Sequence, residues 1–103
     1  MKPVVFVVED SPHNLSHAME FGEIRNIEQN DFPPYRDGSQ VVGRIRRTLS
    51  VFNANVDYIL LVGDPILVGL TFAVLREAAW ATIRVLKWDR QSSRYVPITV
   101  PLS

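Results

Sequence analysis

The chain has 103 residues, 11 acidic and 11 basic side chains, and no cysteine. A chain of this length forms one domain, and the lack of thiols excludes disulfides, thiolate nucleophiles and sulfur-ligated metal sites. Since the formal net charge is zero, no overall field draws the protein to nucleic acid or to a membrane surface.

The first third of the chain predicts a strand, a short helix and a second strand. Val4–Glu9 is an apolar run, which is typical of a strand in the middle of a sheet. An acidic turn with a proline follows, and His13–Phe21 has the apolar residues of a short helix that Gly22 would end. Glu23–Gln29 is predicted to form the second strand.

The middle of the chain predicts a loop and an amphipathic helix. Asn30–Gly38 holds two prolines, a glycine and two aspartates, which is the composition of a loop. Gln40–Asn53 has an apolar stripe at helical spacing, with Ser39 as its expected N-cap. The residues of this stripe are Val41, Val42, Ile45, Leu49 and Phe52.

The most informative stretch begins at Tyr58–Val62. This run is continuously apolar, as in a strand that is covered on both faces of a parallel sheet. Gly63 permits a sharp turn, Asp64 suits a helix N-cap, and Pro65 suits the first helical position because its missing N–H has no partner there. The stretch therefore predicts a strand that turns directly into a helix.

The helix that follows is apolar on all sides. Nearly every residue of Ile66–Leu75 is apolar, so we expect this helix to be largely buried, under a second layer or against another subunit. The run is too short to span a bilayer, which needs roughly 20 apolar residues. Ile83–Trp88 is the next strand, and a strand–helix–strand unit of this kind nearly always pairs its strands in parallel.

The C-terminal segment predicts an edge hairpin. After a loop at Asp89–Ser93, Arg94–Val100 returns antiparallel to the preceding strand. Pro97 and Pro101 donate no ladder hydrogen bonds, which places this strand at the edge of the sheet. The chain is thus predicted to be a single α/β domain over residues 1–103. Its architecture is a small three-layer sandwich with a mostly parallel central sheet of about five strands and an antiparallel C-terminal edge hairpin.

Carboxylates are the first candidate for a binding site. Ligands of open α/β sheets lie beyond the carboxyl ends of the strands, and Glu9, Asp10 and Asp64 follow two strands that we expect to be neighbours. Such a cluster can bind Mg²⁺. The alternative is that Asp64 only caps its helix and Asp10 only belongs to a turn. The sequence has no glycine-rich phosphate loop with its lysine, and we expect no cofactor.

Two histidines form a second candidate. His13 and His17 are four residues apart and share a face if the segment is helical, a spacing that can hold a metal. No third ligand is marked in the sequence, so a solvated or capping role is the simpler interpretation. His13 beside Asp10 can also act as an acid or base, but the sequence marks no nucleophile for it to activate.

Basic residues on the predicted helix form a third candidate. Arg44, Arg46 and Arg47 occupy positions away from the apolar stripe, and Arg36 precedes them. They can contact phosphates. Arginine on an exposed helix face is also ordinary, and zero net charge argues against strong binding of nucleic acid.

The C-terminal hairpin is the fourth candidate. Aromatic and basic residues interleave along it, which suits the stacking of bases and equally suits contact with a protein. Strand alternation places Trp88 on the same face as Leu86, so a packing role is the alternative. The residues concerned are Lys87, Trp88, Arg90, Arg94 and Tyr95.

The last half of the chain resembles a family of short proteins. The segments LLVGDPILVGLTFAV and VLKWDRQSSRY are similar to stretches of small α/β proteins encoded by bacterial viruses, which share a Gly-Asp-Pro turn and a Leu-Lys-Trp-Asp-Arg sequence. The resemblance implies a viral accessory protein and carries no catalytic residue over to this chain.

Three functions follow as hypotheses, the first of them a non-enzymatic accessory protein that associates with itself or binds a macromolecular partner. One basis for it is the charge of residues 1–37, which carry seven acidic and three basic side chains, against four acidic and eight basic in residues 38–103. The alternatives are a metal-dependent phosphate or nucleotide enzyme at the carboxylates, and a nucleic-acid-binding protein. The N-terminal residues lack the pattern of a signal peptide, so we expect a cytoplasmic location, that of the host if the protein is viral.

Overall fold

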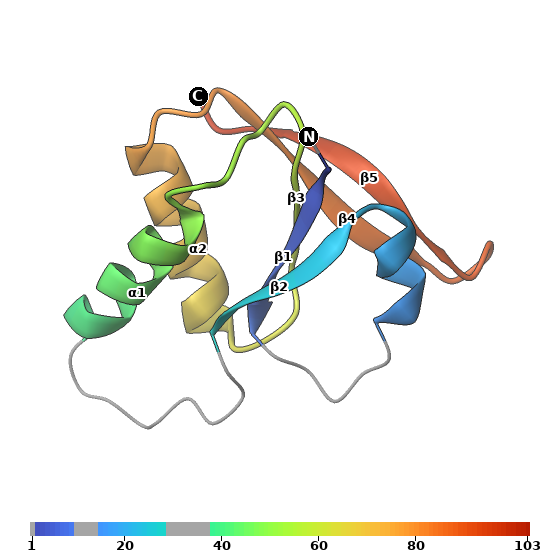
Figure 1. The fold of residues 1–103 in the computed structure, drawn as a ribbon, viewed down its shortest axis with the longest axis horizontal. Coiled ribbons are helices and arrows are strands. Elements are labelled where there is room, and N and C mark those ends of the chain that lie inside the picture. The colour runs from blue at the N-terminus through green and yellow to red at the C-terminus, as the bar shows by residue number, and fades with distance from the viewer. Residues whose placement is uncertain (1, 10–14, 29–37) are drawn as a thin grey trace.

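A computed structural model describes residues 2–9, 15–28 and 38–103 (Figure 1). In these described residues, two α-helices and a short 3₁₀ helix, η1, are interleaved with five strands, and the predicted order of elements is confirmed. The elements are β1 (Val4–Glu9), η1 (Ser16–Glu20), β2 (Glu23–Glu28), α1 (Ser39–Leu49), β3 (Tyr58–Leu60), α2 (Pro65–Glu77), β4 (Thr82–Asp89) and β5 (Arg94–Pro101).

The strands form one mixed sheet in the order β2-β1-β3-β4-β5. Strands β1 to β4 are parallel, and the register of β3 on β4 pairs Ile59 with Val85. Strand β5 is antiparallel to β4 and lies at the edge, where its prolines were predicted to place it. The predicted α/β class and the C-terminal edge hairpin are therefore confirmed. The order of strands reverses between β1 and β3, which is where open α/β sheets bind their ligands.

The two faces of the sheet are covered to different depths (Figure 1). Helices α1 and α2 pack on one face over the larger core cluster, while the five-residue η1 covers the other face over a smaller cluster. Within β1, Phe6 and Val8 belong to the first cluster, and Val5 and Val7 belong to the second. Both faces of β1 are therefore buried, as its continuous apolar run predicted.

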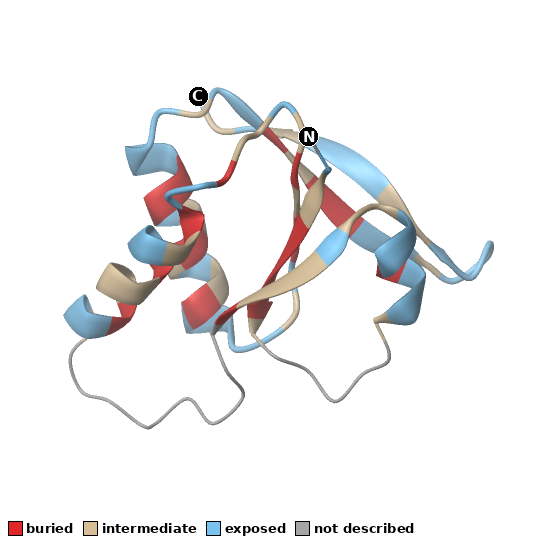
Figure 2. Ribbon diagram, in the orientation of Figure 1, coloured by how far each residue is buried: buried red, intermediate tan, exposed pale blue. Residues whose placement is uncertain are grey.

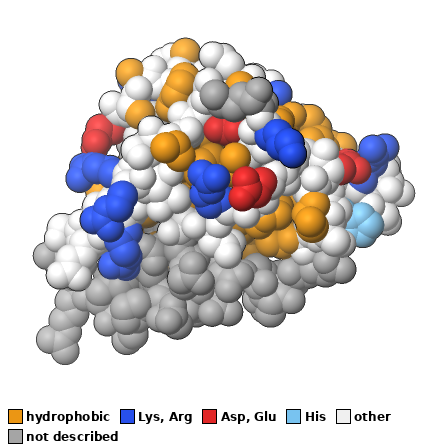
Figure 3. Space-filling view, viewed as in Figure 1, with side chains coloured by type: hydrophobic (Ala, Val, Ile, Leu, Met, Phe, Trp, Pro, Cys, Tyr) orange, Lys and Arg blue, Asp and Glu red, His pale blue; other side chains and the backbone are white. Residues whose placement is uncertain are grey.

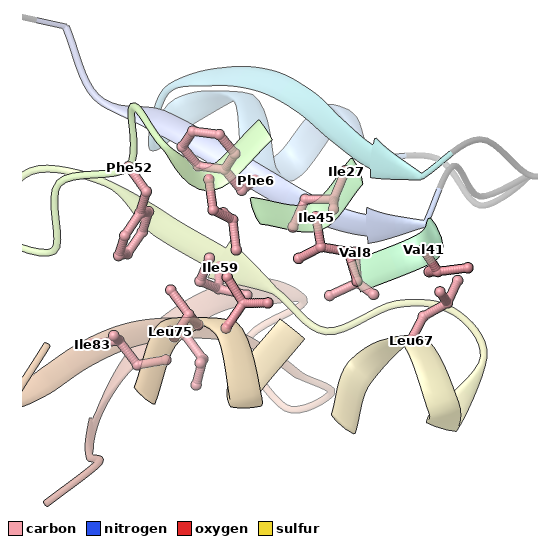
Figure 4. Close-up of a cluster of buried hydrophobic side chains, with 13 residues drawn as sticks. Phe6, Val8, Ile27, Val41, Ile45, Phe52, Ile59, Leu67, Leu75 and Ile83 are labelled. Carbon is pink, nitrogen blue, oxygen red and sulfur yellow. The ribbon is translucent and has the colours of Figure 1, made fainter. Parts of the chain in front are cut away.

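The larger core joins the sheet to both helices (Figure 4). Ile45 of α1 and Leu75 of α2 pack in the same cluster as Ile59 of β3, and all three are at most 1% exposed. Phe52 lies edge-to-face against Phe6, with ring centroids 5.7 Å apart. Full burial of a side chain of this size stabilises the fold by about 1.5–3 kcal/mol.

The start of α2 follows its predicted chemistry. Oδ1 of Asp64 accepts a hydrogen bond from the backbone N–H of Ile66 at 2.8 Å, and Pro65 is the first helical residue. The N-cap expected of Ser39 is wrong, because Gly38 is the N-cap residue of α1 and Ser39 is already helical. Helix α1 ends at Leu49 and not at Asn53, since Asn53 instead stabilises a turn by accepting from the N–H of Asn55.

The burial predicted for α2 is only partly correct. Leu67, Thr71, Val74 and Leu75 are buried against the sheet, but the outer side of the helix is exposed to solvent. Buried and exposed positions alternate along both helices (Figure 2). Ile66 is 63% exposed although its neighbours in sequence are apolar. No second layer covers this side of α2 within the described part of the chain.

The remaining predicted elements differ from the structure at their ends. Strand β3 ends at Leu60, two residues before the end of the apolar run. Of the predicted helix at His13–Phe21, the described residues form a 3₁₀ helix over Ser16–Glu20 with Leu15 as its N-cap residue, and His13 and Asn14 lie outside the described residues. The predicted loop at residues 30–38 lies, except for Gly38, outside the described residues.

Candidate interaction site

An open apolar slot lies where β3 ends and the β4–β5 hairpin continues alone. The last pair between β3 and β4 is Leu60 with Leu86, whereas β4 runs on to Asp89. The slot has a volume of about 320 Å³. We call it the hairpin slot. It is lined by Leu60, Leu61, Val62, Val85, Leu86, Lys87, Trp88, Tyr95 and Ile98.

Exposed apolar residues from three segments line this slot. Leu61 is 39% exposed, Trp88 is 40% exposed and Ile98 is 41% exposed. All three line the same depression, but from both faces of the hairpin, since Ile98 is paired with Val85 whereas Trp88 shares the opposite face with Leu86. Large apolar side chains that gather at one exposed place are typical of a contact surface, whereas single ones are ordinary.

Aromatic packing holds one wall of the slot in place. Trp88 is paired with Tyr95 across the hairpin, and their rings are edge-to-face at 5.1 Å. The imidazole of His17 in η1 lies 5.5 Å from the Trp88 ring. Burial raises the pKa of the Tyr95 phenol. Trp88 therefore has both the packing role and the exposure that the sequence left as alternatives.

Lys87 lines the slot, and two further basic residues belong to the same hairpin. Lys87, Arg90 and Arg94 are all exposed. A guanidinium nitrogen of Arg94 lies 3.7 Å from Oε1 of Glu20 in η1, a long and exposed ion pair. This contact joins an acidic residue of the N-terminal segment to a basic residue of the C-terminal one, so part of the uneven charge is balanced internally.

The hairpin turn is ordered by Asp89. Its Oδ2 accepts from the Ser92 hydroxyl at 2.6 Å, and its Oδ1 accepts from the N–H of Gln91 at 3.2 Å. The Ser92 hydrogen bond, followed by that from Gln91, lowers the pKa of the Asp89 carboxyl below its usual value.

We expect the substitution Ser92→Ala to raise the pKa of Asp89 towards the ordinary value of an aspartate, because it removes the stronger of these donors. Titration of the carboxyl carbon by NMR measures this directly. Gln91→Ala retains the backbone donor and is the matched control. An unchanged Asp89 pKa in the Ser92→Ala variant would show that the hydroxyl does not hold the turn.

Two of the three candidate carboxylates lie close together in the structure. Glu9 and Asp64 lie at the same rim, beyond the carboxyl ends of β1 and β3, and Oε1 of Glu9 accepts from the N–H of Asp64 at 2.9 Å. Asp64 in turn caps α2. Both carboxylates thus bind backbone N–H groups at the point where the strand order reverses. Asp10 and His13 lie outside the described residues, and within the described ones no three His, Cys, Asp or Glu side chains form a metal-binding group.

The basic residues of α1 have unequal surroundings. Arginine side chains gather over α1 in the space-filling view (Figure 3). Arg46 makes two hydrogen bonds of 2.9 Å to the carboxylate of Glu77 in α2, which lowers the pKa of Glu77. Arg44 is half-buried and Arg47 is exposed. The ion pair borders a second hollow of about 310 Å³, which is lined in part by Phe52 and Trp80.

A comparison with protein families decides the relationship of the chain. Residues 3–102 match the model of a family described as Phage Pam3 gp32-like protein. The chain belongs to this family. The resemblance to bacteriophage proteins that the C-terminal half indicated is confirmed at the level of a phage protein family. Neither the curated proteins nor the solved structures contain a match.

The sequence pattern marks only some of the residues that line the hairpin slot. Lys87, Trp88 and Tyr95 were candidates, but Leu61, Val62 and Ile98 were assigned to strands. The length of the apolar run indicated the extra residues. The run extends to Val62, whereas β3 ends at Leu60, so Leu61 and Val62 lie beyond the paired strand. Among the described helices of this family member, none is long and apolar enough to cross a membrane.

Proposed function

We propose that this phage family member is a non-enzymatic accessory protein that binds a protein partner through the hairpin slot, in the cytoplasm of the host. The observation that carries the proposal is the slot itself, a depression of about 320 Å³ whose lining includes the exposed residues Leu61, Trp88 and Ile98. Tryptophan and tyrosine are enriched among the residues that dominate protein interfaces. An apolar centre with a polar rim is the usual anatomy of such an interface.

The charges around the slot specify the chemistry of the partner. Lys87 lines the slot, and Arg90 and Arg94 are exposed in the same hairpin. A protein segment with one apolar side chain for the slot and carboxylates beside it fits this surface, because opposite charges favour encounter and fix the register of the complex. Strand β5 cannot extend the sheet along its whole edge, since Pro97 and Pro101 lack N–H groups. We therefore propose that the partner is recognised by side chains.

Site-specific photocrosslinking in infected cells tests the proposal. A photoreactive phenylalanine analogue at Ile98 is expected to yield a discrete crosslinked product to a second protein. The same analogue at Val51, which is exposed and is not part of the lining of the slot, is the matched control. Leu61→Glu, combined with the analogue at Ile98, is expected to abolish the product. A product of equal yield at both positions, or none at either, would contradict the proposal.

A further inference from the structure

Helix α2 presents an apolar outer stripe that its own fold does not use. Ile66, Gly69, Ala73 and Arg76 recur at spacings of three and four residues, so they lie on one side of the helix, and all four are exposed. The only polar side chain between Pro65 and Leu75 is Thr71, which is fully buried. A surface helix usually carries its polar residues on the outer face, and α2 has its polar residue inside.

Gly69 is not explained by the isolated chain. A Cβ at this position meets nothing within 4 Å, and its φ is not positive. A glycine in the interior of a helix costs about 1 kcal/mol relative to alanine. No contact within the chain requires glycine at this position. Small residues on a helix face allow a second backbone to approach closely, and Ala73 lies one turn further along the same face.

The ends of α2 carry opposite charges. Asp64 precedes the apolar residues and Arg76 follows them, both exposed. Oδ1 of Asp64 accepts from Ile66, but a carboxylate has a second oxygen that can accept from a guanidinium. Arg76 forms no ion pair with any residue that the structure describes. In an antiparallel pair of α2 helices, the acidic end of one copy therefore lies beside the basic end of the other.

We propose that a second copy of this chain docks on α2, with the two helices antiparallel about a twofold axis. Pairing Asp64 with Arg76 of the other copy places the axis at Leu70. Pairing Ile66 with Ala73 of the other copy places it between Gly69 and Leu70. The two positions of the axis agree to within half a residue, and each contact occurs twice, as an isologous interface requires.

The expected dimer is weak. A helix of 13 residues is about 20 Å long, and one helix pair of this length lies at the small end of specific interfaces. The micromolar range is therefore expected for the dissociation constant. The proposal identifies a surface for self-association that is separate from the hairpin slot, so either proposal can fail without the other.

Sedimentation equilibrium from low micromolar to millimolar concentration tests the dimer. The wild-type chain is expected to shift from monomer to dimer over this range. Ile66→Glu is expected to remain monomeric throughout, as is Arg76→Glu, whereas Arg76→Lys retains dimerisation. Met19→Glu and Val51→Glu are matched controls, because these side chains are 63% and 64% exposed, as Ile66 is at 63%, and lie off α2. Circular dichroism shows that each variant is folded.

The register is tested with single cysteines, since the chain has none of its own. Gly69→Cys lies near the proposed axis and is expected to form an intermolecular disulfide on mild oxidation, because a disulfide needs Cα atoms about 4.4–6.8 Å apart. Ile66→Cys is expected not to do so, since antiparallel packing separates the two copies of this residue. A wild-type monomer at millimolar concentration, or a dimer that Ile66→Glu leaves intact, would overturn the proposal.

Discussion

The substitution Gly63→Ala is expected to destabilise the protein by about 3–5 kcal/mol. Gly63 has a φ of 130°, a conformation that costs other residues about 1–3 kcal/mol. A Cβ on this residue would lie 2.5 Å from Cβ of Glu9 and 2.8 Å from its Oε1. Glu9 must then move and release the N–H of Asp64, a charged hydrogen bond worth about 1.5–3 kcal/mol.

Thermal and urea unfolding measure this loss. For a domain of this size the melting temperature falls by about 4–8 °C per kcal/mol, so we expect a decrease of at least about 12 °C. Gly43→Ala is the control, because a Cβ at Gly43 meets nothing within 4 Å, and alanine is the better helix former. This control is expected to melt at a slightly higher temperature. If both variants melt as the wild type does, Glu9 and Gly63 are not in the contact described.

The same rim shows what the sequence could and could not predict. The sequence placed Glu9 and Asp64 at neighbouring strand ends because parallel strands share one carboxyl edge. It could not show that the Glu9 carboxylate is bound to the N–H of Asp64, because that contact depends on the angle at which Gly63 turns the chain. A local pattern predicts which elements form, whereas the partner of a polar side chain is a property of their packing.

In β4 and α2, too, the sequence predicted the element but not everything about its packing. The alternation of β4 correctly predicted that Trp88 shares a face with Leu86, since the period of a strand is two residues. The apolar composition of α2 predicted burial, but composition cannot show how many sides of a helix the rest of the chain covers. In the structure one side is covered and Ile66 is exposed. The mismatch between composition and burial is the basis of the proposed dimer.

Asp57 is the buried carboxylate that the sequence did not single out. It is 5% exposed, and its two oxygens accept from the N–H of Val4 at 2.9 Å and from the N–H of Asn53 at 2.8 Å. It therefore ties the start of β1 to the segment that follows α1. No side chain in the sequence pattern marks these donors, because both are backbone groups and Val4 is 53 residues away.

The substitution Asp57→Ala is expected to cost about 3–5 kcal/mol, since it leaves two part-buried N–H groups without an acceptor and each costs about 1–3 kcal/mol. Asp57→Asn retains one acceptor oxygen and turns an amide N–H₂ towards the other donor, so an intermediate loss is expected. Urea unfolding measures both. Asp89→Ala is the control, because that carboxylate also accepts two hydrogen bonds but does so at the surface, and its loss is expected to destabilise the protein much less. Equal losses of unfolding free energy in Asp57→Ala and Asp89→Ala would show that the hydrogen bonds of Asp57 to Val4 and Asn53 do not stabilise the fold.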